Sequence, residues 1–370
     1  MEREDINPNA ADTEYGRTPL WLAAGGGYQG IVRLLLEPDN VNPNTSDTKY
    51  NQTPPWLVAG GGYEGIVRLI LEREDINPNA ADTEYGRTPL WLAAGGGHQG
   101  IVRLLLERDN VNPNTSDTKY NQTPLWLAAG GGYEGIVRLI LEREDINPNA
   151  ADTEYGRTPL WLAVGGGYHG IVRLLLERDD VNPNTPDTRY DQTPLLLAAV
   201  VGNEGAVKLL FEREDINPNL PDTEYGRTPL WWAASGGHET VVKLLLERED
   251  INPNTPDTKY GHTPLLLAAV GGHEKVVKLL LEREDLDPDI PGWSGETALE
   301  SAASWGHAGV VQLLSEPRPS LPVLIGAEMA ESRSLDTPPP GNIPISSSKK
   351  RTADTSDGGN QRKKPRGPLI

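Results

Sequence analysis

The side chains that could carry out acid–base chemistry in this chain recur at one position and do not form a cluster. Four of the six histidines occupy equivalent places in a repeated pattern, where tyrosine or asparagine stands in other copies. These four are His98, His238, His273 and His307. A position that accepts such different side chains indicates packing at the start of a helix. His169 and His262 stand alone, without the recurring serine and aspartate that a catalytic triad needs.

One glycine motif has the spacing of a dinucleotide-binding loop, Gly25-x-Gly27-x-x-Gly30. Such a loop needs a strand before it and a long crossover helix after it. Here the preceding apolar stretch opens with a Thr-Pro helix start, the helix that follows is too short, and no basic residue approaches a phosphate. The motif therefore indicates a connection between two helices, and we expect no nucleotide cofactor.

An acidic series near the end of the pattern resembles a calcium-binding loop. It reads Asp285-x-Asp287-x-Asp289, with Glu296 in the twelfth place. Ile290 stands where such a loop needs glycine for its sharp turn. Because other copies of the pattern carry asparagine at the place of Asp289, we interpret the series as a return loop and expect no metal.

Tyrosine returns every 35 residues, and Thr-Pro follows it three residues later. The recurring tyrosines are Tyr15, Tyr50, Tyr85, Tyr120, Tyr155, Tyr190, Tyr225 and Tyr260. A fixed period of this size is typical of stacked structural repeats. In such an array, function usually lies on a long repeated surface. We expect each tyrosine either to pack in its turn or to contact a partner.

Each repeat predicts two short helices joined by tight connections, as residues 12–45 illustrate. Thr18 caps a helix that begins at Pro19 and continues through an apolar stretch to Ala24. Three glycines end it. A second helix follows over residues 29–37, with Ile31 and Leu34 among its inward-facing apolar side chains. Neither helix is long enough to be stable alone, so stacking on neighbours must fold them.

The chain resembles the ankyrin repeat, through Gly-x-Thr-Pro-Leu-x-x-Ala-Ala-x-x-Gly followed by Val-x-Leu-Leu-Leu and an asparagine-containing loop. The resemblance covers residues 1–315 as nine units of 35 residues, a length similar to that of fungal arrays. It implies an all-α solenoid of stacked helix–turn–helix units with connecting turns and hairpin loops. A more polar ninth unit is typical of a terminal cap.

The sequence departs from the ankyrin pattern after Thr-Pro-Leu, where the family has histidine. Tryptophan stands there at Trp21, Trp91, Trp126, Trp161 and Trp231. We expect packing to replace the hydrogen bond that the histidine makes, and we expect these indoles to belong to the core.

A second period of 70 residues shows in the charges beside the turn tyrosines. Residues 2–71 and 72–141 differ at only four positions. The residue before each tyrosine alternates in sign: Glu14, Lys49, Glu84, Lys119, Glu154, Arg189, Glu224 and Lys259. Either neighbouring turns pair opposite charges, worth about 0–1 kcal/mol for each exposed pair, or the alternation only records duplication of a two-repeat unit.

Composition restricts the partners. The chain of 370 residues has a formal net charge of −19 and no cysteine. The array carries 47 acidic and 25 basic residues, a net of −22, which favours basic partners over nucleic acid or anionic membrane. The first residues contain no apolar stretch that could act as a secretory signal. Without cysteine, thiolate catalysis and Cys-ligated zinc are excluded.

Residues 316–370 form a segment rich in proline and serine, which we expect to be a disordered tail. It holds two basic clusters, made of Lys349, Lys350, Arg351, Arg362, Lys363, Lys364 and Arg366. Their spacing resembles a bipartite nuclear import signal, and we expect an import receptor to bind it. The alternatives are a basic tail that contacts its own acidic array or nothing, and direct binding of nucleic acid.

The leading hypothesis is a non-catalytic scaffold that binds a basic protein along its turn-lined concave face, in the nucleus or otherwise in the cytoplasm. We expect no enzyme activity, small-molecule substrate or membrane insertion. The expected contact residues are Glu14, Tyr15, Arg17, Lys49, Tyr50, Glu84, Tyr85, Arg87, Lys119, Tyr120, Glu154, Tyr155, Arg157, Tyr190, Tyr225 and Tyr260.

The alternative hypothesis places this chain at the C-terminal end of a longer protein. Its first unit is as apolar as the internal ones, and its near-identical repeats resemble the recognition arrays of fungal immune-type NTPases. The chain would then be the sensor of a larger signalling protein.

Overall fold

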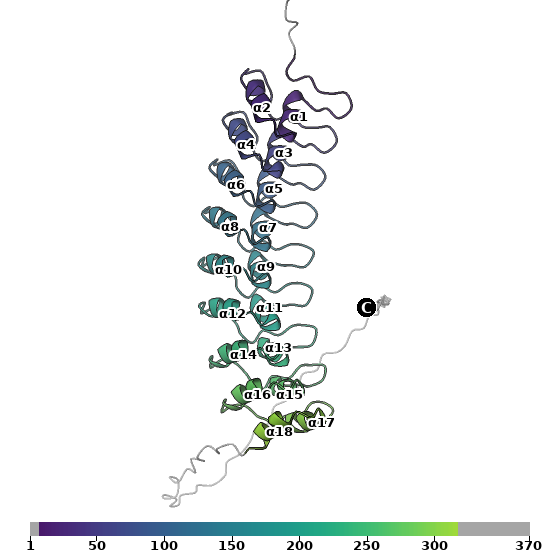
Figure 1. The fold of residues 1–370 in the computed structure, drawn as a ribbon, viewed down its shortest axis with the longest axis vertical. Coiled ribbons are helices and arrows are strands. Elements are labelled where there is room, and N and C mark those ends of the chain that lie inside the picture. The colour runs from purple at the N-terminus through teal and green to yellow at the C-terminus, as the bar shows by residue number, and fades with distance from the viewer. Residues whose placement is uncertain (1–6, 317–370) are drawn as a thin grey trace, which may run out of the picture. The chain divides into compact units, whose positions relative to one another are not determined.

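The repeats fold as a stack of helix pairs. A computed structural model describes residues 7–316, and the expected tail with its basic clusters lies outside them. Within the described residues there are eighteen helices and no strand. The helices form two parallel rows, with a turn projecting from each repeat beside the inner row (Figure 1). The predicted all-α ankyrin-type solenoid is confirmed.

The odd-numbered helices form the inner row. They are α1 (Pro19–Gly25), α3 (Pro54–Gly61), α5 (Pro89–Gly95), α7 (Pro124–Gly130), α9 (Pro159–Gly165), α11 (Pro194–Val201), α13 (Pro229–Ser235), α15 (Pro264–Val270) and α17 (Ala298–Ser304). The even-numbered helices form the outer row. They are α2 (Gln29–Leu36), α4 (Glu64–Leu71), α6 (Gln99–Leu106), α8 (Glu134–Leu141), α10 (His169–Leu176), α12 (Glu204–Leu210), α14 (Glu239–Leu246), α16 (Glu274–Leu281) and α18 (Ala308–Ser315).

Each inner helix starts and stops through local chemistry. In α7, the Thr123 hydroxyl accepts a hydrogen bond from the Trp126 amide at 3.1 Å, and Pro124 takes the first position. At the other end, Gly132 has φ of +74°, a left-handed conformation that side chains rarely adopt. α17 has no proline and uses a reciprocal capping box between Thr297 and Glu300 instead.

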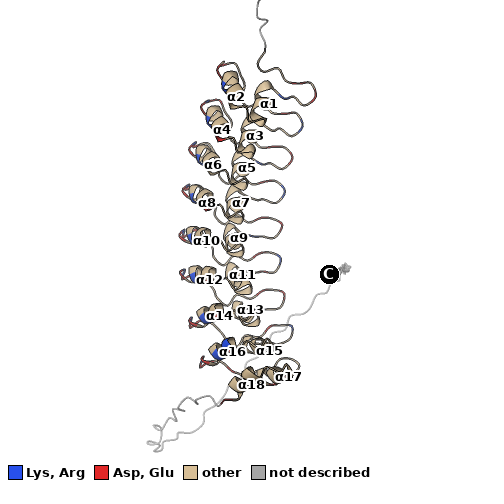
Figure 2. Cartoon of the chain, viewed as in Figure 1, with Lys and Arg blue, Asp and Glu red and all other residues tan. Residues whose placement is uncertain are grey.

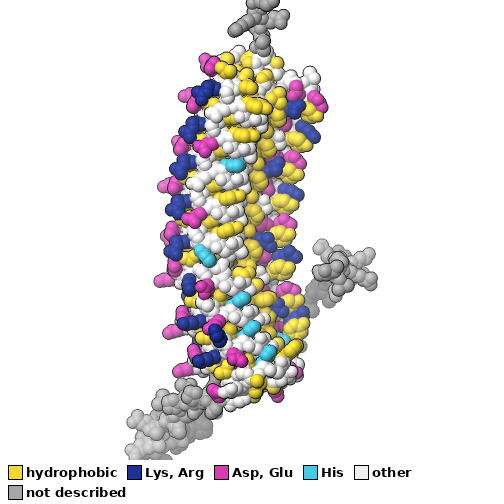
Figure 3. Space-filling model, in the orientation of Figure 1, with side chains coloured by type: hydrophobic (Ala, Val, Ile, Leu, Met, Phe, Trp, Pro, Cys, Tyr) yellow, Lys and Arg dark blue, Asp and Glu magenta, His cyan; other side chains and the backbone are white. Residues whose placement is uncertain are grey.

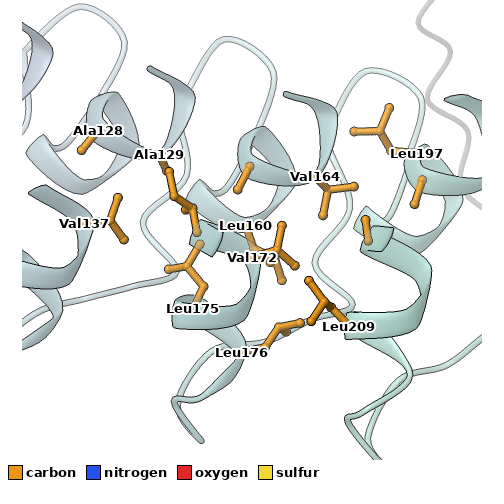
Figure 4. Packing of buried hydrophobic residues seen from close by; sticks show 14 of the residues in the cluster. Ala128, Ala129, Val137, Leu160, Val164, Val172, Leu175, Leu176, Leu197 and Leu209 are labelled. Carbon is orange, nitrogen blue, oxygen red and sulfur yellow. The ribbon is translucent and has the colours of Figure 1, made fainter. Parts of the chain in front are cut away.

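The core runs without interruption from one repeat to the next (Figure 4). Ala128 and Ala129 of α7 are fully buried, which lets neighbouring inner helices approach closely. Val137 of α8 closes the layer from the outer row, and Leu160 of α9 continues it in the next repeat. Since no helix exceeds eight residues, burial against neighbours is what stabilises each one.

One packing prediction fails in the first repeat. Ile31 and Leu34 of α2 are 51% and 64% exposed, although we expected both to face inward. The equivalents in α4, which packs against α2, are less exposed: Ile66 is buried and Leu69 is half-buried. Within the described residues no helix pair precedes α2, so Ile31 and Leu34 have no neighbour to cover them.

The tryptophans also behave differently from the prediction that packing replaces a hydrogen bond. The Trp126 indole nitrogen donates to the backbone carbonyl of Arg157 in the next repeat, at 2.8 Å. The same bond, to the residue before the next Thr-Pro, is made by Trp21, Trp56, Trp91, Trp161 and Trp231. The indoles are mostly half-buried and link repeats through a specific donor. Tryptophan therefore packs and keeps a hydrogen bond.

Asparagine side chains connect the return loops along the whole array. The Asn149 side chain donates through Nδ2 to the Asp180 carbonyl at 2.6 Å and accepts through Oδ1 from the Asn182 amide at 2.8 Å. Equivalent pairs of bonds are made by Asn9, Asn44, Asn79, Asn114, Asn184, Asn219 and Asn254. One amide thus satisfies a donor and an acceptor of the following loop. Asp289, which has no donor, occupies this position in the ninth repeat.

Arginines reinforce the same edge. Arg213 makes two hydrogen bonds to the Asp215 carboxylate, at 2.9 and 2.8 Å, and reaches back to the Leu176 and Val181 carbonyls. The hydrogen bonds from the guanidinium hold the pKa of Asp215 below its usual value. Arg108 has asparagine in place of that aspartate, and its buried Nε has no partner.

Replacing Trp126 with phenylalanine should lower the free energy of unfolding by about 1 kcal/mol, because the Arg157 carbonyl loses its donor while the ring keeps most of its packing. Urea unfolding of the full chain measures this. Trp305→Phe is the control, since Trp305 is largely exposed and its indole makes no bond of this kind in the described structure. Equal effects of the two substitutions would contradict the assigned hydrogen bond.

Asn149→Asp should destabilise the array by about 1–3 kcal/mol, because the carboxylate cannot donate to the Asp180 carbonyl. Asn110→Asp makes the same chemical change at a different position. In most other repeats this position holds the aspartate that pairs with the arginine equivalent to Arg108, so the new carboxylate should pair with Arg108. We expect that second variant to be neutral or stabilised by up to ~1 kcal/mol. The urea concentrations at the unfolding midpoints of both variants test these two expectations. A loss of similar size in both would rule out a specific role for the Asn149 amide.

Candidate protein-binding surface

An aspartate, buried in all but the first repeat, builds each of the eight turns that carry a recurring tyrosine. The Asp82 carboxylate accepts from the Tyr85 amide at 2.6 Å and from the Arg87 guanidinium at 2.9 Å. Burial of this carboxylate acts to raise its pKa, but those hydrogen bonds outweigh it and hold the pKa of Asp82 below its usual value. Gly86 follows with φ of +68°. The aspartate thus fixes where the tyrosine projects.

The second, fourth and sixth repeats close the turn differently from the first. Asn51 stands in place of glycine with φ of +56°, and its side chain donates to the Ala81 carbonyl of the next repeat. Gln52 replaces the arginine, so the Asp47 carboxylate accepts from the Tyr50 and Gln52 amides instead. The same turn is therefore built in more than one way, and the eighth repeat returns to glycine at Gly261.

Backbone hydrogen bonds connect neighbouring turns. The Thr118 amide donates to the Tyr85 carbonyl at 2.7 Å, and Thr153 donates to Tyr120 at 2.8 Å. The turns consequently lie one beside the next along one edge of the array, with charged residues at their tips (Figure 2). We call the eight turns that carry Tyr15 to Tyr260, each with the charged residue before its tyrosine, the turn row.

Every tyrosine of the turn row has a cation over its ring. In odd-numbered repeats the cation is the arginine two residues later, as with Arg17 at 4.1 Å from the Tyr15 ring centre. In even-numbered repeats it is the basic residue just before the tyrosine, as with Lys119 at 4.6 Å from Tyr120. The remaining pairs involve Tyr50, Tyr85, Tyr155, Tyr190, Tyr225 and Tyr260. The expected packing within the turn is thus observed, and contact with a partner stays a prediction.

The acidic member of the turn row contacts its own tyrosine. A hydrogen bond with Glu84 raises the pKa of the Tyr85 phenol, and Glu154 does the same for Tyr155. A hydrogen bond with the Tyr120 phenol raises the pKa of the Lys119 ammonium. The phenols, carboxylates and ammonium groups of the turn row therefore form polar contacts at its surface.

The expected charge pairing between neighbouring turns does not take the form of ion pairs. Among residues 7–316, none of the salt bridges joins a glutamate of the turn row to a lysine or arginine of the row. The basic side chains lie over tyrosine rings instead. Lys259 even contacts two, at 4.3 Å from Tyr225 and 5.0 Å from Tyr260. Cation–π contacts thus occupy the place where we considered salt bridges.

Beside the turn row lies a surface without formal charge, which we call the inner face. It consists of exposed glycines of the inner helices and the leucines packed against them, and Figure 3 shows it between two charged edges. Leu57 packs against Gly25, and a Cβ at Gly25 would lie 3.3 Å from it. The other leucines packed in this way are Leu92, Leu127, Leu162 and Leu197. Their recurrence every 35 residues was a usable signal, but our expected contact residues omit them.

The other motifs that suggested chemistry have structural positions. Gly25 is the last residue of helix α1 and Gly27 lies between α1 and α2, so the motif connects two helices, as we expected, and does not follow a strand. The histidine position lies just before each outer helix, where the predicted packing is confirmed. His307 also contacts the Val270 carbonyl, at 2.9 Å. In the described part of the chain, no three His, Asp or Glu side chains group as a metal site would require.

The import-signal residues, from Lys349 to Arg366, lie outside the described residues. Among residues 7–316 no helix has the length and apolarity needed to cross a membrane.

Comparison with known proteins gives a direct match to one family. The family described as ankyrin repeats in three copies matches residues 40–117, 110–187, 180–257 and 252–321, and a single ankyrin repeat matches residues 15–48. No curated protein matches the chain. The matches cover most of the sequence and the same residues that form the stacked helix pairs. This chain therefore belongs to the ankyrin-repeat family.

Proposed function

We propose that the chain is a non-catalytic scaffold that binds a basic protein along the turn row and the inner face. Ankyrin repeats are protein–protein interaction modules, which supports a protein as the partner. The observation that carries the proposal is the row of eight tyrosines, each held by an aspartate, which is buried in seven of the eight turns, and each contacted by a cation. Tyrosine and arginine are the residues most enriched at the energetic centres of protein interfaces.

The tyrosines supply contact area at a low entropic cost. A side chain already fixed by a cation over one face of its ring loses less freedom on binding than a free one. Tyr190 and Tyr260 remain 37% and 47% exposed despite those contacts. The adjoining inner face adds uncharged surface, so a partner could bury apolar groups between the charged edges.

The basic character of the partner rests on the long-range field of the array. Much of the negative charge lies at the ends of the outer helices, where Glu72-Arg73-Glu74-Asp75 alone carries a net of −2. The Arg73–Asp75 ion pair neutralises two of these charges and leaves the two glutamates. Such a field attracts a cationic partner over a distance, while the turn row and the inner face make the contacts.

Removing three turn tyrosines together should weaken partner binding by about tenfold or more. The variant is Tyr85→Ala, Tyr120→Ala and Tyr155→Ala. Its matched control replaces three exposed arginines of the outer helices, Arg103, Arg138 and Arg173, with alanine. Affinity capture with the full chain, followed by binding measurements on the captured protein, tests this.

Raising the salt concentration to about 0.5 M should also release the partner, because the field of the array is then screened. A partner that binds the tyrosine variant and the parent equally would contradict the proposed surface. A partner retained at high salt would contradict its basic character.

We further propose that the two basic clusters of the C-terminal segment bring the chain into the nucleus. The support is the spacing alone: Lys349-Lys350-Arg351, ten residues, then Arg362-Lys363-Lys364-Pro365-Arg366. An array of net −22 repels nucleic acid, so the clusters suit an import receptor better than DNA or RNA.

Deleting residues 349–366 from a fluorescent fusion of the full chain should abolish its nuclear enrichment. Deleting an equally long stretch without the clusters, residues 328–345, should leave that enrichment unchanged. Microscopy of the three fusions gives the result. Nuclear enrichment that survives the first deletion would end the import proposal.

A further inference from the structure

The charged side chains of the turn row are exposed and form no salt bridge with one another within the described chain, although Glu84 and Glu154 attract Lys49 and Lys119 of the preceding turns. All eight, from Glu14 to Lys259, are exposed at the turn tips. Their sign alternates from one repeat to the next, and the salt bridges of the array leave them out. They contact tyrosines of the row, but their formal charges remain available to an incoming surface.

The order of these charges is complementary to its own reverse. Read forward, the row is Glu, Lys, Glu, Lys, Glu, Arg, Glu, Lys; read backward, every acid meets a base. The opposed residues are Glu14 with Lys259, Lys49 with Glu224, Glu84 with Arg189, and Lys119 with Glu154. Each pairing occurs twice between two copies, which gives eight opposite-charge pairs. We propose that a second copy of this chain docks on the turn row in antiparallel orientation.

Other alignments of two rows are worse. In a parallel alignment in register, every residue meets its own type and the charges repel. A parallel alignment shifted by one repeat makes seven opposite-charge pairs and leaves a free residue at each end. The antiparallel alignment alone pairs all eight and is closed by a two-fold axis, which passes between Lys119 and Glu154. Closed two-fold symmetry is also the commonest arrangement of homodimers.

The tyrosines give this interface an apolar component. They occupy the same row as the charges, and the backbone hydrogen bonds between turns fix their spacing. Two identical arrays therefore present rows with the same spacing, which a partner of unrelated fold would not. The net charge of the arrays opposes association at low salt, whereas high salt screens the pairs. Dimer formation should accordingly be strongest at intermediate ionic strength.

The proposal is tested with two complementary charge variants of the full chain. The first carries Glu14→Lys, Glu84→Lys, Glu154→Lys and Glu224→Lys. The second carries Lys49→Glu, Lys119→Glu, Arg189→Glu and Lys259→Glu. Each row then has a single sign, so each variant alone should dimerise at least about tenfold more weakly than the parent. Mixing the two variants should restore association. Sedimentation velocity over a concentration series measures all four samples.

Matched controls change the net charge by the same amount at positions outside the turn row. Glu72, Glu142, Glu212 and Glu282 become lysine in the control for the first variant, and Arg33, Arg103, Arg173 and Lys243 become glutamate in the control for the second. All eight positions are exposed on the outer row. Apart from the effect of the changed net charge, both controls should dimerise with the same affinity as the parent. Folding of each variant is checked by its circular dichroism.

Orientation is tested by cross-linking, because the chain has no cysteine of its own. Glu14→Cys mixed with Lys259→Cys should form a disulfide-linked dimer, while Glu14→Cys alone should not. A parent chain that stays monomeric up to about 0.1 mM overturns the proposal, as does a failure of the mixed charge variants to associate. Cross-linking of Glu14→Cys with itself overturns the antiparallel orientation.

This inference goes beyond the proposed function and does not rest on it. A basic partner and a second copy would use the same row, so partner binding should compete with dimerisation. A monomeric parent that still binds its partner through the tyrosines would leave the proposed function intact. A dimer that binds no basic protein would leave this inference intact.

Discussion

Contact between neighbouring repeats is the interaction on which this structure depends. The helices have seven or eight residues, which is below the length at which a helix is stable in water. Each one buries its apolar side against the helices before and after it, and the exposed Ile31 and Leu34 of α2 show what happens where no described helix pair precedes. Stability is therefore shared along the stack and belongs to no single repeat.

Apolar contact is non-directional, so it would not by itself fix the orientation of one repeat on the next. Three kinds of hydrogen bond, which are directional, fix that orientation in nearly every repeat of the array. Asn149 and its equivalents join the return loops, the tryptophan indoles join the inner helices, and backbone amides such as that of Thr118 join the turns. Each bond reaches the equivalent place in the next copy, so the spacing of the repeats is set at three separate points.

This rigid spacing gives the surface its functional character. Because the repeats are evenly spaced, the eight turn tyrosines recur at regular intervals, each held by an aspartate and contacted by a cation. The charged residues that precede them form a row of alternating sign. The alternating charges form no salt bridges with one another within the described chain and are exposed at the surface. The proposed binding of another protein and the proposed self-association both rest on this surface.

The sequence alone determined the helices, their order and the stacked architecture, because these depend on local chemistry and on burial. The signals were the 35-residue period, the Thr-Pro helix starts and the apolar stretches. The turn tyrosines could likewise be recognised from their recurrence. The sequence did not reveal the indole hydrogen bond of Trp126, the two hydrogen bonds of the Asn149 side chain or the cation over each tyrosine ring. These contacts join atoms that are distant in the chain or depend on which way a side chain turns, and only the packed stack decides which donor lies within reach of which acceptor.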